Sequence, residues 1–232
     1  IKGDKLISII IINYNVSKHL KSCIDSIYDS NIKSPFEIIV VDNNSTEALD
    51  VDLLLNNSHN PVKFIQLDNN IGFAGAVNHA VNQSSGSEIL LLNPDTLVDK
   101  NTVQLLADYV ISNNNVGVVG SKVTFPSGKY QLSSKRHFPT LGIILTKFLK
   151  LDKLFSRNKY FGKYNYTYLN HDDLAYVDSI SGACMMFRKE IFKDIGQFDE
   201  NFFLYFEDTD FCYRTLKKEY KVVYNPECKI VH

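Results

Sequence analysis

The sequence predicts an α/β domain with a Rossmann-like, mostly parallel central sheet flanked by helices. Short apolar runs rich in β-branched residues recur through the first half of the chain, at residues 6–12, 37–41, 62–67, 88–92 and 116–119. Polar, helix-compatible segments lie between several of these runs, at residues 18–30, 75–83 and 102–112. Uninterrupted apolar strands that alternate with helices are typical of a parallel sheet buried on both faces. This half therefore predicts a mononucleotide-binding β-α-β-α-β arrangement.

The alternation stops after residue 124 and returns near residue 176. Between them lies a stretch rich in lysine and aromatic residues, which we interpret as an insertion or lid. Beyond it the pattern predicts a strand at 176–187, helices at 189–195 and 207–218, and a last strand at 221–224 that Pro226 ends. We therefore expect one domain over 1–232, with a nucleotide-binding half (1–124), the insertion (125–175) and an acceptor and catalytic half (176–232).

Composition excludes several classes of protein. The chain has 232 residues, 44% of them hydrophobic, and a formal net charge of −1, so overall charge does not favour nucleic acid. The four cysteines lie far apart and have neither zinc-site nor disulfide-scaffold spacing, which favours a reducing compartment. No apolar run is long enough to span a bilayer and no signal peptide is evident, so we expect a cytoplasmic protein. Because the sequence starts at Ile1 rather than Met, we also expect it to be a segment of a longer protein.

Polar side chains follow four of the predicted strands. Each alone is best explained by turn or helix-cap chemistry, which asparagine and aspartate favour. Ligands of doubly wound sheets bind at the carboxyl ends of the strands, so the coincidence of all four favours a site. The candidate donor-binding residues at these ends are Asn13, Asn15, Asp42, Asn44, Asn70, Asn93 and Asp95.

The two carboxylates in this set suggest distinct roles. Asp42 can accept a hydrogen bond from a base or ribose; the alternative is that it caps the next helix. Asp95 follows a buried strand, and Pro94 stiffens the approach to it. A rigid carboxylate at this point suits a hard divalent cation that takes further oxygen ligands from phosphates and water. The alternative for Asp95 is a simple turn.

A glycine-containing run precedes the helix predicted at 75–83. Gly72, Phe73 and Gly75 lead into it, and Asn78 lies one turn further on. Glycine allows close backbone approach, and the amino terminus of a helix offers N–H groups to phosphates or sugar hydroxyls. The run lacks the G-x-G-x-x-G pattern, which disfavours a dinucleotide.

An acidic cluster opens the helix predicted at 207–218. Glu207, Asp208 and Asp210 follow an aromatic run, and crowding of carboxylates there favours a general base with raised proton affinity. The alternative is structural, because acidic residues stabilise the amino terminus of a helix and Asp210 can pair with Arg214. His232 follows another strand-like run and is either incidental or a partner of Asp95 in a cation site.

The ordered set of motifs resembles the family-2 glycosyltransferases of the GT-A fold, particularly their bacterial rhamnosyltransferase-like branch. The matching segments are 9–15, 40–45, 70–78, 91–95, 181–188, 196–200 and 203–210. The resemblance implies that Asp42 contacts the nucleobase, that Asp95 is the remaining carboxylate of a D-x-D metal motif whose first position is Asn93, and that His232 is a second metal ligand. It also implies that Gly182 and Ala183 lie under the donor sugar.

The reaction implied by this resemblance is inverting transfer of a sugar from a nucleotide diphosphate donor, such as dTDP-rhamnose or a UDP-sugar. Asp208, within the catalytic pair Glu207 and Asp208, would accept the proton of the acceptor hydroxyl. A Mn²⁺ or Mg²⁺ ion would stabilise the departing diphosphate. The acceptor would be a saccharide or lipid-linked saccharide of a cell-surface polysaccharide. A nucleotidyltransferase and a catalytically silent nucleotide- or sugar-binding module are the alternatives.

The insertion contains a strongly basic segment at residues 135–163. It carries eight basic residues against one acidic residue, interleaved with leucine, isoleucine and phenylalanine. This pattern predicts a basic amphipathic helix. Such a helix lies either on an anionic membrane, which here would be the inner face of the plasma membrane, or packed on the domain with its lysines in solvent.

Overall fold

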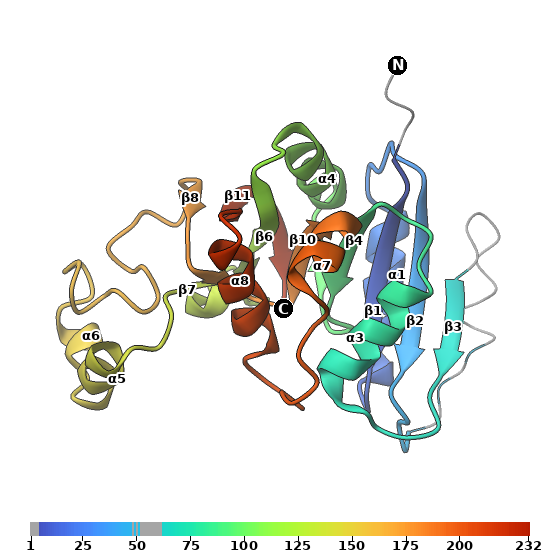
Figure 1. Cartoon of the computed structure of the whole chain (residues 1–232), viewed down its shortest axis with the longest axis horizontal. Helices are drawn as coiled ribbons and strands as arrows, with labels where there is room; N and C mark the ends of the chain where they lie inside the picture. The colour runs from blue at the N-terminus through green and yellow to red at the C-terminus, as the bar shows by residue number, and fades with distance from the viewer. Residues whose placement is uncertain (1–4, 48, 50, 52–61) are drawn as a thin grey trace.

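The computed structural model describes residues 5–47, 49, 51 and 62–232 (Figure 1). Its centre is a sheet of nine strands among these residues, in the order β3-β2-β1-β4-β10-β6-β11-β5, with β8 paired to the side of β11. The strands are β1 (Ile7–Asn13), β2 (Phe36–Asp42), β3 (Val62–Gln66), β4 (Glu88–Leu92), β5 (Leu97–Val98), β6 (Val116–Thr124), β8 (Ala175–Tyr176), β10 (Cys184–Arg188) and β11 (Lys221–Val231).

The first four strands confirm the predicted parallel half. β3, β2, β1 and β4 are neighbours and all run parallel, with Asn13 opposite Asp42 in the β1–β2 register. Every residue of β1 is buried, as expected for a strand covered on both faces. Because parallel strands end at one edge of the sheet, the polar residues after β1, β2 and β4 gather there.

Helices cover both faces of this sheet. Side chains alternate between faces along a strand, so Ile9 and Ile11 join one apolar cluster while Ile10 and Ile12 join the other. The first cluster includes buried residues of α1 (Ser17–Tyr28) and α4 (Thr102–Ser112). The second includes α3 (Gly72–Asn82), α7 (Lys189–Ile195) and α8 (Glu207–Lys217).

The second half of the sheet departs from the prediction at two strands. The strand expected over 176–187 is three strands, β8, β9 (Ser179–Ile180) and β10, because β9 leaves the main sheet to pair with β7 (Lys135–Arg136). The last strand does not end at Pro226 but continues to Val231. Its pairing with β6 shifts register between Asn225 and Lys229, and this irregularity accommodates a proline that donates no hydrogen bond.

β10 is the one strand that runs against both of its neighbours in the described sheet. It lies between β4 and β6, with Cys184 opposite Leu92 and Met186 opposite Val119. The residues that precede β10 therefore emerge at the same edge as the residues that follow β4. This places the turn at Gly182 and Ala183 beside the polar strand ends.

The helices of the insertion form a separate lobe, while Tyr166 of the same segment is buried in the core of the domain. After η1 (Leu132–Ser134) and β7, the chain makes α5 (Leu141–Phe148) and α6 (Leu151–Leu154). Figure 1 shows these two helices at the end of the molecule opposite β3. None of the helices in the described residues has the length and apolarity needed to cross a membrane.

The tight fit beneath β1 yields a stability prediction. A Cβ atom at Gly86 would lie 2.5 Å from Ser8 Oγ and 2.6 Å from the Ser8 backbone nitrogen. Gly86→Ala should therefore lower the free energy of unfolding by about 1–3 kcal/mol, because the backbone of β1 must shift. Urea denaturation measures the change.

Gly142→Ala is the matched control for this substitution. A Cβ atom there meets nothing within 4 Å, and the residue lies in α5. The control should be neutral or stabilising by up to about 1 kcal/mol, since alanine favours helix over glycine. Equal effects of the two substitutions would mean that contact with β1 does not decide the cost.

Candidate active site

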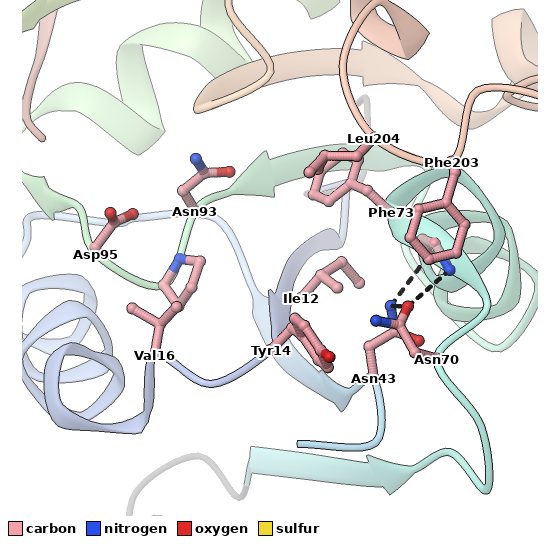
Figure 2. A pocket seen from close by; sticks show the side chains of 12 residues that line it. Ile12, Tyr14, Val16, Asn43, Asn70, Phe73, Asn93, Asp95, Phe203 and Leu204 are labelled. Atoms are coloured by element: carbon pink, nitrogen blue, oxygen red, sulfur yellow. Dashed lines mark hydrogen bonds between the residues drawn. The ribbon is translucent and has the colours of Figure 1, made fainter. Parts of the chain in front are cut away.

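A pocket of about 330 Å³ opens at the carboxyl edge of the sheet (Figure 2). Figure 2 shows Asn93 and Asp95 at one end of this pocket and Asn43 and Asn70 at the other, with Tyr14 between them. Its volume is in the range of small-ligand sites. Five of the residues predicted from sequence line it: Asn70, Gly72, Phe73, Asn93 and Asp95.

The amide end of the pocket is held by Asn43. Its Nδ2 donates to Asn70 Oδ1 at 2.9 Å and to the Gly72 carbonyl at 3.2 Å, and its Oδ1 accepts from the Ile71 backbone at 3.0 Å. Asn43 is 3% exposed, so these bonds fix the loop that leads into α3. Asn43 is not among the residues predicted from sequence, although Asn43 follows the same strand as the predicted Asp42 and Asn44.

Asp42 is not among the residues that line the pocket. Its Oδ1 accepts from Asn13 Nδ2 and Ser45 Oγ, both at 2.6 Å, and its Oδ2 accepts from Gln66 Nε2 and the Ser45 backbone. Burial acts to raise the pKa of Asp42, but these hydrogen bonds outweigh it and lower the pKa. The residue is 2% exposed, and the pocket wall excludes Asn13 as well as Asp42. Contact of Asp42 with a nucleobase stays a prediction.

Three other predicted asparagines are also outside the pocket lining. Asn15 and Asn44 have positive φ angles of 56° and 61°, and Asn15 Oδ1 accepts from the Thr46 backbone at 2.8 Å. Asn78 is buried in α3, where its amide bonds both ways with the Phe198 backbone and donates to Glu200 at 2.9 Å. These contacts indicate that the three asparagines form turns or pack within the domain, which are the alternatives to a role in binding a ligand.

The first N–H groups of α3 are less available to a ligand than expected. Gly72 has φ +77°, and its N–H donates to Asn70 Oδ1 at 3.0 Å. The N–H of Phe73 donates to the Phe203 carbonyl at 3.0 Å. A Cβ at residue 72 would lie 2.8 Å from the same carbonyl, so glycine is needed for the close approach of residue 203. The loop before α8 thus closes one side of the pocket.

Asp95, at the opposite end of the pocket, contacts His232. Nε2 of His232 lies 3.2 Å from Asp95 Oδ1. The hydrogen bond from His232 lowers the pKa of Asp95, against burial, which raises it. His232 is held at its backbone as well, because its N–H donates to the Thr124 carbonyl at 2.9 Å and its carbonyl accepts from Gln131 at 2.6 Å.

The charge of the pocket fits a divalent cation. Of the described residues that line it, none is lysine or arginine, and Asp95 is the one carboxylate. An anionic diphosphate would therefore meet negative rather than positive charge. A carboxylate and an imidazole side by side are suitable ligands for a cation that takes its other ligands from phosphate and water. No group of three or more histidine, cysteine or acidic side chains suited to a metal occurs in the described residues.

The turn before β10 joins the pocket to the acidic cluster. The Ala183 carbonyl accepts from the Asn93 N–H at 3.0 Å. One residue earlier, the Gly182 N–H donates to Asp208 Oδ2 at 2.9 Å. Asp95 and Asp208 are therefore held on either side of one short turn, although they come from strands and helices far apart in the sequence.

Asp208 also forms an ion pair that sequence analysis did not predict. Arg136 Nη2, on β7, donates to Oδ2 of Asp208 and to the Ile180 carbonyl. Oδ1 accepts from the Thr209 hydroxyl at 3.1 Å. The two oxygens of Asp208 thus differ, since Oδ2 carries the strong donors. Arg136 stands in a basic run, and no spacing in the sequence distinguishes it from its neighbours.

Glu207 is buried beside this pair. It is 7% exposed, and its Oε2 has no hydrogen-bond partner among the described residues. Burial raises the pKa of Glu207 to about 7, and the charge of Asp208 acts in the same direction while Arg136 opposes it. Glu207 is therefore partly protonated near neutral pH.

A comparison with protein families matches residues 8–196 to the family described as "Glycosyl transferase family 2". The chain belongs to this family. The match covers β1 to α7, including the strand ends and the Gly182–Ala183 turn, and agrees with the resemblance seen in the motifs. In this family-2 glycosyltransferase, Asp95 lies within the matched residues and Asp208 follows them.

Curated relatives are distant but extend over the whole chain. The low-salt glycan biosynthesis hexosyltransferase Agl10 of Haloferax volcanii is 27% identical over 97% of this chain and 65% of its own length. The N-acetylglucosaminyl-diphospho-decaprenol L-rhamnosyltransferase of Mycobacterium tuberculosis is 24% identical over 98% of this chain and 76% of its own. The chain thus spans about two thirds to three quarters of these relatives.

Solved structures support the GT-A fold. GalNAc-T7, crystallised with UDP, GalNAc and Mn²⁺, superposes with a TM-score of 0.74 over 100% of this chain and 44% of its own, at 13% identity. The mannosyltransferase PcManGT from Pyrobaculum calidifontis, in complex with GDP-Man and Mn²⁺, gives 0.69 over 97% and 56%, at 16% identity. At these identities the likeness concerns the fold.

The burial of Glu207 predicts a pH-dependent stability. Its pKa of about 7 in the folded state lies above the ordinary value of 4.5, so its protonated form is favoured by folding. Its contribution is therefore fully present below about pH 4.5 and is lost as pH rises through 7. Glu207→Gln, which stays uncharged, should gain on the order of 3 kcal/mol relative to wild type between these pH values.

Urea denaturation of both proteins across this pH range tests the effect. The matched control is Glu227→Gln, which makes the same chemical change at an exposed position of β11. If the two substitutions followed the same pH dependence, burial of Glu207 would not be its cause.

Proposed function

We propose that this chain carries out inverting transfer of a sugar from a nucleotide diphosphate donor to a hydroxyl of a saccharide or lipid-linked saccharide, in the synthesis of a cell-surface polysaccharide. One observation carries the proposal: the Gly182–Ala183 turn bonds on one side to Asn93, two residues before Asp95, and on the other to Asp208. A donor diphosphate near Asp95 and an acceptor near Asp208 would meet across this turn.

The donor-binding role rests on the pocket. Amide groups at one end offer both donors and acceptors to a base or ribose, and Tyr14 and Phe73 provide apolar surface. The names of the relatives favour a hexosyl or rhamnosyl group, and therefore a UDP-sugar or dTDP-rhamnose as donor. The M. tuberculosis name also includes a polyprenyl diphosphate-linked acceptor, which supports a lipid-linked saccharide here.

We propose that Asp95 and His232 hold a Mn²⁺ or Mg²⁺ ion. Asp95 lines the pocket, Nε2 of His232 lies 3.2 Å from Asp95 Oδ1, and the pocket has no basic side chain among its described lining residues to offset a diphosphate. When bound, the cation would neutralise charge on the departing nucleoside diphosphate. Two neighbours of the same fold contain Mn²⁺, which supports this assignment. Asn93, in place of a second carboxylate, leaves more of the coordination to the donor.

Asp208 is proposed as the general base. Arg136 and the Gly182 N–H hold Oδ2, so the carboxylate is fixed in orientation. Oδ1 is then the oxygen that accepts the proton of the acceptor hydroxyl as that hydroxyl attacks the anomeric carbon. A single displacement of this kind inverts the configuration. Glu207 is proposed to position Asp208, because its Oε2 is buried without a hydrogen-bond partner among the described residues.

The described cysteines support a reducing compartment. Cys23, Cys184, Cys212 and Cys228 are all free and buried. We therefore propose that transfer takes place on the cytoplasmic side of the cell.

The two alternative functions, a nucleotidyltransferase and a silent binding module, predict different properties of the protein. A nucleotidyltransferase would use a glycine- and lysine- or arginine-rich phosphate loop, and the segment after β1 is Asn13-Tyr14-Asn15. A silent binding module would bind nucleotide without transfer. Intact Asp95 and Asp208 favour the enzyme.

Donor binding is tested by thermal shift with UDP, dTDP, GDP and ADP, each with and without MnCl₂. One diphosphate should raise the unfolding temperature in the presence of metal, since saturation at about 100 times Kd adds roughly 2.7 kcal/mol of stability. Asp95→Asn should lose most of the metal-dependent part. Asp29→Asn, an exposed residue that ends α1, is the control. Absence of any shift in wild type would contradict the donor pocket.

The role of Asp208 is tested by Asp208→Asn. Transfer should fall by about 10²- to 10⁴-fold, because the amide cannot accept the proton. The nucleotide-induced shift should remain. Asp210→Asn is the matched control in the same helix turn; its carboxylate pairs with Arg214 at 2.7 Å, and its loss should leave transfer largely intact. Loss of nucleotide binding together with transfer would make Asp208 structural.

A further inference from the structure

The apolar face of α5 points away from the protein. Leu141, Ile144, Leu145 and Phe148 are 87%, 52%, 57% and 81% exposed. Their spacing places them on one side of the helix. Ile143, on the opposite side, is 5% exposed and is the one buried residue of this helix. The packed helix, one of the two alternatives drawn from sequence, would bury the stripe and is therefore wrong.

The exposed apolar surface continues past α5. Leu154 and Tyr160 are 72% and 81% exposed, and Leu149 and Phe155 are about half exposed. We call these residues, together with the outward residues of α5, the hairpin surface: Leu141, Ile144, Leu145, Phe148, Leu149, Leu154, Phe155 and Tyr160. This number of exposed apolar side chains within one short segment marks an interaction site, because single exposed ones need no partner but a group of them does.

Basic residues surround the hairpin surface. Residues 141–163 carry six basic residues and one acidic residue, a net charge of +5, while the rest of the chain carries 19 basic and 25 acidic residues, a net charge of −6. All six basic side chains belong to exposed residues. None of them forms a salt bridge with a residue that the structure describes. Lys147 Nζ lies over the ring of Tyr164, 4.2 Å from its centroid, and the positive charge of the other five is available to a partner of opposite sign.

We propose that the hairpin surface docks on an anionic phospholipid bilayer. An apolar stripe flanked by unpaired lysine and arginine matches a membrane interface, where apolar side chains enter the acyl boundary and basic ones meet lipid phosphates. A second copy of this chain is a poorer match, because it would bring the same +5 segment into contact with itself. Figure 1 shows α5 and α6 at one end of the molecule, where a flat surface can reach them.

The docking surface lies close to the proposed base. Arg136 pairs with Asp208, and Leu141 follows only five residues later, a span of at most about 18 Å. The ring of Phe138 in this connection packs edge-to-face on Tyr213 of α8, with centroids 5.3 Å apart. Docking would therefore bring the Asp208 end of α8 near the lipid headgroups. Membrane binding itself does not depend on the proposed transfer reaction.

Flotation with lipid vesicles tests the proposal, without donor or acceptor. The chain should float with vesicles of phosphatidylcholine and phosphatidylglycerol, bind pure phosphatidylcholine much less, and be released by high salt. Leu141→Gln with Phe148→Gln should weaken binding at least about tenfold. Lys150→Gln with Lys153→Gln should weaken it about 25-fold, or fivefold for each charge.

Lys33→Gln with Lys100→Gln is the matched control, since it removes two exposed charges outside the hairpin surface and should retain binding. Thermal unfolding should be unchanged in all three variants because the substituted side chains are exposed. Failure to float with anionic vesicles, or equal binding by all variants, would overturn the proposal. So would a concentration-dependent dimer in sedimentation velocity that Leu141→Gln with Phe148→Gln abolishes. These results leave the nucleotide and Asp208 experiments unaffected, so the two proposals fail separately.

Discussion

The position of β10 is the constraint on which the rest of the site depends. It runs antiparallel between two strands of the sheet, with Cys184 opposite Leu92. That register brings the Gly182–Ala183 turn to the carboxyl end of β4, where it bonds to Asn93 and Asp208 together. A one-residue slip would turn every side chain of β10 to the other face and lose both contacts. The buried Met185 and Phe187, which pack on α7 and α8, prevent that slip.

The charge of the described pocket lining favours the proposed donor diphosphate when it carries a cation, because a bare anion would meet only the carboxylate of Asp95. Phosphate sites often rely on free N–H groups at a helix amino terminus. Here Gly72 and Phe73 already donate to neighbouring groups, and the described lining has no lysine or arginine. The polar side chains that line the pocket are therefore amides, the Tyr14 hydroxyl and the carboxylate of Asp95. The bond from the Phe73 N–H to the Phe203 carbonyl also connects this pocket to the segment that precedes α8.

Sequence reasoning worked where a residue's role follows from its place at a strand end. The parallel half of the sheet, the exposure of Asp95 to a pocket and its contact with His232, 137 residues away, all followed from that rule and from family resemblance. It failed where tertiary contacts decide. Asn78 looked like a ligand-binding amide but clamps the turn at Phe198 and Glu200. Arg136 could not be identified, because only the pairing of β7 with β9 brings it to Asp208. Pro226 looked like a strand end because a register shift leaves no mark in one sequence.

The uneven distribution of charge described for the insertion also makes the molecule a strong electric dipole. Its positive pole is the lobe of α5 and α6, and the remainder is net negative. Within about 8 to 10 Å of an anionic surface, where ions do not yet screen the field, such a dipole experiences a torque. The molecule would rotate so that the lobe arrives first and the negative body faces away. The molecule would thus be oriented before it touches the surface. A molecule that approached with its negative body first would be repelled.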